Sequence, residues 1–409
     1  MSPSERPAAV VLAVDAGLVA AALHRPLLAA LALGLARGAR SALVVAAAAS
    51  LAVAWGSVRV ADLDRHVLAP GPSTEVVTVT GPPSGSRAAA AVPRAGETVV
   101  LMAPGTILTQ GGVYRVHGSL RPLDPDVRGY YSTQGIHLQL RATQAVKLGR
   151  RDGLWGVVDT AHRYVLARLG AVPAPSPARA LVAGIALGDT AGLPYAERET
   201  LRASGLYHVV AVSGQNVALL IVFTLVALGV AGVIGAPARL TAGTVTAAYV
   251  LVSGAGPSIV RAGVAGVLVS AAWLASRPAP PWHLMACGAA VVLGFDPLEL
   301  FDPGFQLSFA AVAAILLVAP RLRGAVGEAA AVSIACTVVT APIAWWHFGR
   351  LTPLAVPANL LALPAVAPIL WLATIAAAVG SVWAPLAAPF LGLADLLSAY
   401  VLWVARACS

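Results

Sequence analysis

The sequence R-A-S-G-L-Y-H-V-V-A-V-S-G-Q-N-V-A-L-L, residues 202–220, opens the more hydrophobic half of the chain. No Asp, Glu, Lys or Arg occurs in residues 203–238. Of the 409 residues, 58% are hydrophobic and 11% are charged, whereas a soluble domain carries roughly a quarter charged residues. This deficit of charge and the long uncharged runs predict a membrane protein that crosses the bilayer several times.

Polar side chains gather at the start of this apolar run. His208 and Gln215 are seven residues apart, which places them on nearly one face of a helix, with Asn216 beside them. Ser213 precedes a glycine, a pair that allows the backbone to bend. In lipid, such groups must find partners inside the protein or line a water-filled cavity. Two interpretations stay open: a polar seam that joins helices, or the lining of a route across the membrane.

The net charge is +9, and Lys147 is the only lysine. A basic chain suits a negatively charged partner such as phospholipid or nucleic acid, although cytoplasmic loop charge explains the balance equally well. Cys287, Cys336 and Cys408 lack the spacing of a disulfide framework or a zinc site, and we interpret them as packing residues.

Three apolar runs occupy residues 8–23, 26–36 and 41–56. Arg37 and Arg40 lie between the second and third runs, and the positive-inside rule places this loop in the cytoplasm. The N-terminus is therefore expected in the cytoplasm as well, and the third run leads the chain to the outside.

Residues 59–150 change in character, because apolar and polar residues alternate between Gly/Pro-rich turns. The pattern predicts a β-barrel or β-sandwich outside the membrane. A barrel of the oligonucleotide-binding (OB) type fits, but the pattern alone does not single it out. The expected strands lie at 76–80, 97–102, 112–118 and 136–142.

Aromatic and basic residues in this domain are candidates for stacking on and binding single-stranded nucleic acid. The alternative role for the aromatic residues is packing in the core or at an edge beside turns. The candidates are Arg115, Arg121, Arg128, Tyr130 and Tyr131.

Residues 151–205 read as a linker with helical pieces. Apolar residues that include Trp155 and Val158 recur at helical spacing and predict an amphipathic helix over 153–170 on the membrane surface. Two short helices are expected at 178–189 and 194–205.

Nearly all of residues 206–409 is expected in the membrane. Prolines in residues 351–394 predict kinked or re-entrant helices around a cavity. The candidate spans are 206–234, 240–255, 257–276, 282–295, 304–320, 327–347, 353–380 and 383–405.

Further polar residues interrupt these apolar runs, namely Ser258, Arg261, Asp302, Gln306 and Asn359. An Arg four residues into an apolar run costs about 3 kcal/mol on insertion scales unless it is paired or reaches the interface. Arg261 therefore serves either as a charge that guides phosphates or as one half of a buried ion pair with Asp302 or Asp296. For the two aspartates, capping of helix N-termini is the favoured role.

No Walker A loop, no His-rich metal-hydrolase motif and no G-x-S-x-G sequence occurs in the chain. His208 and Ser213 have no acidic partner in a readable arrangement. We therefore expect no enzyme, no metal site and no cofactor, and we expect the energy for any transport to come from another protein.

Five motifs occur in order over about 180 residues: G-I-A-L-G-D (184–189), G-L-Y-H-V-V-A-V-S-G-Q-N-V (205–217), G-P-S-I-V-R-A (256–262), F-D-P-G-F-Q-L-S-F-A-A (301–311) and P-A-N-L-L-A-L-P (357–364). In these motifs the chain resembles the ComEC-type competence proteins, bacterial inner-membrane channels that admit single-stranded DNA during transformation. Members of that family place an OB-like domain after their first spans, as residues 59–150 do here.

The chain also departs from the family. Many members carry His where Asn216 stands, so the role of that His is not carried over. Full-length members often continue into a metallo-β-lactamase-like domain, which this chain, ending at Ser409, does not include. The resemblance then implies a separate nuclease or a truncated member. The outer domain has no cysteine pair, so no disulfide is expected there.

The expected fold is a mainly α, polytopic membrane protein with N-terminal transmembrane segments (1–58), an extracytoplasmic OB-like β-domain (59–150), amphipathic and linker helices (151–205) and a channel domain of broken helices (206–409). The resemblance implies a multi-pass protein of the bacterial inner membrane. Its expected partners are single-stranded DNA, membrane lipid, a DNA receptor, a cytoplasmic helicase or translocase and a separate nuclease.

Residues expected to line the DNA pathway are His208, Ser213, Gln215, Asn216, Ser258, Arg261, Asp302, Gln306 and Asn359. Two alternatives stay open: a small-solute transporter or exporter whose outer domain is a lid, and a degenerate relative that only scaffolds partners.

Overall fold

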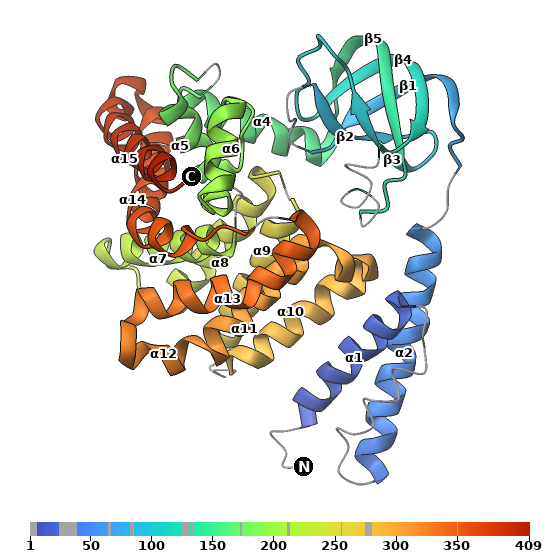
Figure 1. The fold of residues 1–409 in the computed structure, drawn as a ribbon, viewed down its shortest axis with the longest axis vertical. Helices are drawn as coiled ribbons and strands as arrows, with labels where there is room; N and C mark the ends of the chain where they lie inside the picture. Colours follow the sequence, from blue (N-terminus) through green and yellow to red (C-terminus); the bar gives the residue numbers. More distant parts are fainter. Residues whose placement is uncertain are drawn as a thin grey trace.

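Two apolar helices, a five-stranded barrel and a larger helical bundle follow one another along the chain in the computed structural model (Figure 1). The structure describes residues 6–23, 39–63, 67–81, 83, 86–124, 131, 134–171, 174–210, 213–254, 256–274, 280–349 and 351–409. The apolar run expected at 26–36 lies outside the described residues.

Helices α1 (Arg6–Ala22) and α2 (Ala39–Leu63) pack against each other because small residues line their contact. A Cβ atom on Gly17 would lie 2.5 Å from the carbonyl oxygen of Ala49, so only glycine permits this approach. Helix α2 continues to its end at Leu63, past the domain boundary expected after residue 58.

The β-domain is a closed barrel with strand order β1-β2-β3-β5-β4, in which β3 and β5 pair in parallel and the other neighbours pair antiparallel. Inward-facing side chains such as Val77, Val99 and Leu140 are fully buried in its core. The strands are β1 (Gly71–Val79), β2 (Arg87–Val92), β3 (Glu97–Met102), β4 (Gly112–Pro122) and β5 (Leu138–Arg150).

The alternation in the sequence located four of these strands, and the structure decides for a barrel over a sandwich. The alternation pattern did not reveal β2, because the sequence R-A-A-A-A-V shows no contrast in polarity between the two faces of the strand. The backbone pairing of β2 with β1 and β3 supplies what its side chains do not signal.

Three helices connect the barrel to the bundle, at nearly the expected positions: α4 (Gly153–Arg168), α5 (Pro177–Leu187) and α6 (Tyr195–Ala203). The Ser176 hydroxyl accepts a hydrogen bond from the Arg179 amide and caps the start of α5. At the other end, Gly188 has a φ of 73°, a left-handed conformation that favours glycine and ends the helix.

The bundle contains helices at all eight expected spans. They are α7 (Gly214–Val230), α8 (Ala236–Val252), α9 (Pro257–Leu274), α10 (Pro281–Phe295), α11 (Pro303–Leu317) with α12 (Ala319–Val326), α13 (Glu328–Phe348), α14 (Ala355–Val382), and the turn η4 (Ala384–Ala387) with α15 (Ala388–Ala407).

Among the described residues, three helical segments are long and apolar enough to cross a membrane: α13, α14 and residues 384–407. Helices α11 and α12 make a fourth if they count as one span, bent by 58°. Helices α7, α8 and α10 have 15–17 residues, fewer than the about 20 that a straight span needs.

Helix α14 includes Pro364 and Pro368 within one continuous element, which a helix inside a bundle tolerates when its freed carbonyls find other partners. One expectation for the bundle needs correction. The expected span 206–234 is not one helix, since a 3-10 turn, η2 (Tyr207–Val209), precedes α7 and Ser213 is extended. His208 and Gln215 therefore do not share a helix face.

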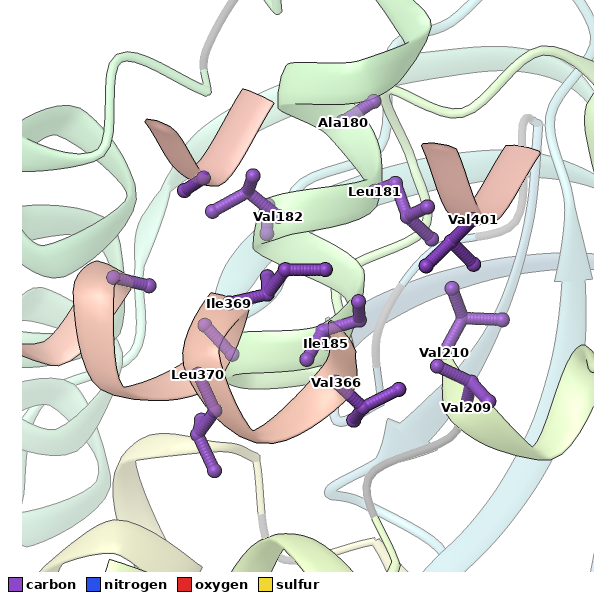
Figure 2. Close-up of a cluster of buried hydrophobic side chains, with 14 of the residues drawn as sticks. Ala180, Leu181, Val182, Ile185, Val209, Val210, Val366, Ile369, Leu370 and Val401 are labelled. Carbon is purple, nitrogen blue, oxygen red and sulfur yellow. The ribbon is translucent and has the colours of Figure 1, made fainter. Parts of the chain in front are cut away.

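The core of the bundle forms around α5, which is buried on nearly every side. Figure 2 shows Leu181, Val182 and Ile185 of α5 packed among Ile369 of α14 and Val401 of α15. Arg179 holds this packing in register, because its guanidinium binds Asp395 of α15 at 2.6 and 2.7 Å. The helices expected as a linker thus contribute to the core of the bundle.

Candidate functional site

Arg261 lies in the second turn of α9 and is only 6% exposed. Its Nη1 atom lies 2.7 Å from Glu299 Oε2 and 3.7 Å from Asp302 Oδ1. Glu299 belongs to η3 (Pro297–Phe301), the turn between α10 and α11. Burial raises the pKa of Glu299, and the Arg261 charge offsets this rise in part. The ion pair expected for Arg261 is thus present, with Glu299 as its nearest partner.

Capping explains why the carboxylates lie here. Asp302 accepts a hydrogen bond of 2.9 Å from the Phe305 amide and starts α11, while Asp296 accepts one from the Leu298 amide and starts η3. The capping roles expected for both aspartates are therefore observed. A Cβ atom on Gly304 would lie 2.8 Å from both Arg261 and Asp302, so glycine lets the first turn of α11 approach α9.

Gln306 extends this polar cluster one turn further along α11. Its Nε2 atom donates to the Leu300 carbonyl at 2.9 Å, and its Oε1 atom lies 2.9 Å from His347 Nε2 at the end of α13. Three predicted pathway residues, Arg261, Asp302 and Gln306, are thus neighbours at one end of α9, α11 and α13.

Asn216 is buried in a different contact. Its Nδ2 atom donates to the Ile185 carbonyl at 2.6 Å, and the Tyr249 hydroxyl donates to the next carbonyl, Ala186, at 2.8 Å. The last carbonyls of a helix have no partner within it, so α7 and α8 supply partners for the end of α5. In this conformation Asn216 joins helices, the first of the two roles that the sequence left open.

The other predicted pathway residues are more accessible. His208 and Gln215 are exposed, whereas Ser213, Ser258 and Asn359 are half-buried. Ser213 is the N-cap of α7 but makes no side-chain capping bond.

The first turns of α7 and α11 each approach α9, one at Ala262 and the other at Arg261. A Cβ atom on Gly214, the first residue of α7, would lie 3.7 Å from the Ala262 side chain, and Gly304 in the first turn of α11 approaches Arg261 itself. Helix N-termini carry partial positive charge from unpaired amides. This corner of the bundle therefore combines a guanidinium, helix N-termini and two carboxylates.

In the barrel, Arg115 and Arg121 are exposed on β4. Arg128 and Tyr130 lie outside the described residues. Tyr131 is half-buried and packs against Val100, Leu123 and Ile136, the core role that the sequence left open.

His117 is not among the residues predicted from the sequence, although it alternates with Arg115 on the outer face of β4. Its Nδ1 atom lies 2.8 Å from the Thr74 hydroxyl on β1. Glu299 and His347 also contact predicted site residues without having been selected. The sequence did contain a signal for Glu299. It is a third carboxylate between two aspartates that already cap helices, so it is available to pair with a buried cation. Among the described residues, no group of His, Cys, Asp and Glu is arranged to hold a metal ion.

Comparisons with known proteins bear on the bundle. The model of a family described as competence protein matches residues 185–409, more than half of the chain and all nine predicted pathway residues. ComE operon protein 3 of Bacillus subtilis (strain 168) is 26% identical over 250 residues, which cover 58% of this chain and 31% of that protein. The uncharacterized protein YcaI of Escherichia coli (strain K12) is 28% identical over 275 residues, which cover 62% and 35% respectively.

The chain spans about a third of the length of these two relatives. No solved structure matches the chain. The family match ends at the last residue of the chain and takes in every helix from α6 to α15. The chain therefore belongs to the competence protein family.

Proposed function

We propose that this protein is a channel of the bacterial inner membrane that admits single-stranded DNA during natural transformation. The observation that carries the proposal is the buried guanidinium of Arg261 beside the first turn of α11, with the first turn of α7 against the adjacent Ala262 of α9. Phosphates are favoured at helix N-termini and by guanidinium groups, which bind their oxygens in a fork. Family membership supports a role in DNA uptake.

In this conformation the guanidinium of Arg261 is paired with two carboxylates, those of Glu299 and Asp302. A DNA phosphate would exchange with Glu299 for the guanidinium, and burial already makes the Glu299 carboxylate costly to keep ionised. Passage also requires α9 and α11 to separate, because the buried Arg261 of α9 lies against the first turn of α11. We therefore assign the described conformation to the closed state of the channel.

In this proposal the barrel receives the single-stranded DNA. Its strand order and the parallel β3–β5 pair support an OB-type barrel, and the exposed Arg115 and Arg121 on β4 supply charge for phosphates. We place the barrel outside the cytoplasm and the N-terminus inside, as the Arg37 and Arg40 loop predicts. A DNA receptor, a cytoplasmic helicase or translocase and a separate nuclease complete the pathway.

The test is complementation in a transformable bacterium whose own channel gene is deleted. Cells that produce this chain are given fluorescent DNA, and the nuclease-protected fluorescence is measured, with uptake of small labelled anions in parallel. DNA uptake that returns with the wild-type chain and falls with Arg261→Ala and Gln215→Leu at equal membrane level supports the proposal. Anion uptake without DNA uptake supports a small-solute transporter instead.

A further inference from the structure

An open cavity of about 670 Å³ lies where the barrel joins the bundle, between the end of β5 and the first turns of α4. It is separate from the polar cluster around Arg261. Its lining includes Arg150, Arg151, Gly156, Val157, Arg163 and Tyr164.

The cavity lining carries a net positive charge, because its three arginines face two aspartates, Asp152 and Asp159. Arg151 is paired with the buried Asp159 by bonds of 2.5 and 2.8 Å. Arg163 donates to the Thr160 hydroxyl in the cavity wall at 2.9 Å, and burial, followed by the like charge of Arg150, lowers its pKa. Arg150 and Arg163 thus border one cavity of net positive charge and feel each other's charge, which favours an anion between them.

The first turn of α4 adds backbone amide groups that can donate hydrogen bonds to an anion. Its N-cap, Asp152, makes no side-chain capping bond, and two of the residues that line the cavity are Gly153 and Gly156. No side chain at these glycines covers the amides of the first turn, which have no partner within the helix.

An apolar face of α4 borders the same cavity. Leu154 and Val157 are 73% and 67% exposed, and Tyr164 continues this face two turns later. The position of α4 fits a membrane boundary, because His162 Nδ1 donates to the carbonyl of Val252, the last residue of the apolar helix α8, at 2.6 Å. An apolar stripe beside arginines is typical of a helix that lies in the headgroup region.

We propose that this cavity binds the phosphate of an anionic phospholipid between Arg150 and Arg163, with the acyl chains along Leu154 and Val157. The lipid would hold the base of the barrel at the membrane surface. The exposed aliphatic side chains of Leu154 and Val157 favour lipid here over nucleic acid, whose bases stack on flat aromatic groups. The aromatic residue of the lining, Tyr164, already has the Arg168 guanidinium over its ring at 4.8 Å.

The test places the full chain in nanodiscs that contain equal amounts of phosphatidylglycerol and phosphatidylcholine, and counts the lipids retained after mild extraction by native mass spectrometry. The wild-type chain is expected to retain phosphatidylglycerol. Arg150→Gln and Arg163→Gln should each reduce the retention of phosphatidylglycerol about fivefold. This factor corresponds to the attraction of one basic residue to an anionic surface. The double change Arg150→Lys with Arg163→Lys should keep most of it.

The control is Arg115→Gln with Arg121→Gln, which removes two positive charges from β4, more than either single test change, and should leave phosphatidylglycerol retention unchanged. Arg150→Gln is the decisive single change, since this exposed residue ends a strand and its loss does not endanger folding. Equal retention by Arg150→Gln and the wild-type chain would overturn the proposal. So would displacement of phosphatidylglycerol by a single-stranded oligonucleotide, which would make this a nucleic-acid site.

Discussion

The guanidinium of Arg261 and the carboxylate of Glu299 approach to 2.7 Å, although they belong to separate elements, α9 and η3, and both are largely buried. Asp302 adds a second carboxylate at 3.7 Å. A single cation therefore balances two anions at the point where α9 meets the start of α11. This dependence makes the cluster both a structural joint and a site at which a competing anion can act.

Arg261→Ala should reduce the free energy of unfolding by about 3–5 kcal/mol, because two buried carboxylates lose their counter-charge. Thermal unfolding in detergent measures this loss, and Arg261→Ala with Glu299→Gln should recover part of it. Arg323→Ala is the matched control, since the Arg323–Glu328 pair is exposed and should contribute less than about 1 kcal/mol. Equal effects of the two single changes would contradict this account.

Asn216 and Gln215 are neighbours with different expected effects. Asn216→Ala should cost about 1–3 kcal/mol of stability, because the buried Ile185 carbonyl loses its side-chain partner. Gln215→Ala, at an exposed position, should leave the melting temperature unchanged and reduce DNA uptake. Melting curves and uptake at matched membrane level separate the two effects. A drop in stability for Gln215→Ala would assign it a structural role.

The buried Asp159 fixes α4 to the barrel, since it binds Arg151 through both oxygens and lies against Gly111 of the β3–β4 loop. Asp159→Ala should destabilise the chain by about 3 kcal/mol and expose the barrel–α4 joint to proteases. Asp124→Ala removes a comparable but more exposed pair with Arg141 and serves as control. Unchanged proteolysis of Asp159→Ala would show that other contacts hold the joint.

Asp189 predicts a pH effect. Burial alone would raise its pKa, but hydrogen bonds from His162 and the Ala191 amide, with the charge of His162, bring the pKa below the usual 3.8. A carboxyl with a lowered pKa in the folded state contributes stability above its unfolded pKa and loses it as the pH falls. The difference in melting temperature between the wild-type chain and Asp189→Asn should therefore be largest near neutral pH and shrink below about pH 4. A constant difference over this range would contradict the assignment.

Local patterns in the sequence predicted the elements of this fold well. Long apolar runs located α7 to α11 and α13 to α15, and alternation located four strands, because helix and strand periods are properties of the local chain. Both capping aspartates were also predictable, since capping acts over two or three residues. The alanine-rich β2 escaped because its pairing is decided by neighbours distant in sequence.

The contacts of the site were less predictable for the same reason. Arg261 was expected to pair with Asp302 or Asp296, and the nearest carboxylate is that of Glu299, a choice set by how η3 turns between α10 and α11. Asn216 and Gln215 are adjacent in sequence, yet one is buried and the other exposed, because α7 begins at Gly214 and its start contacts the end of α5. No local sequence pattern predicts this contact between α7 and α5, because the two residues that make it are 31 positions apart.

The central claim is that DNA passes the start of α9. A photo-crosslinking amino acid at Ser258, one turn before Arg261, tests it in transformable cells that depend on this chain and take up labelled DNA. The matched control is Val267, nine residues further along α9 and on its opposite face. The account predicts that single-stranded DNA crosslinks at position 258 and not at 267. Uptake with no crosslink at 258, or with equal crosslinks at both positions, would contradict it.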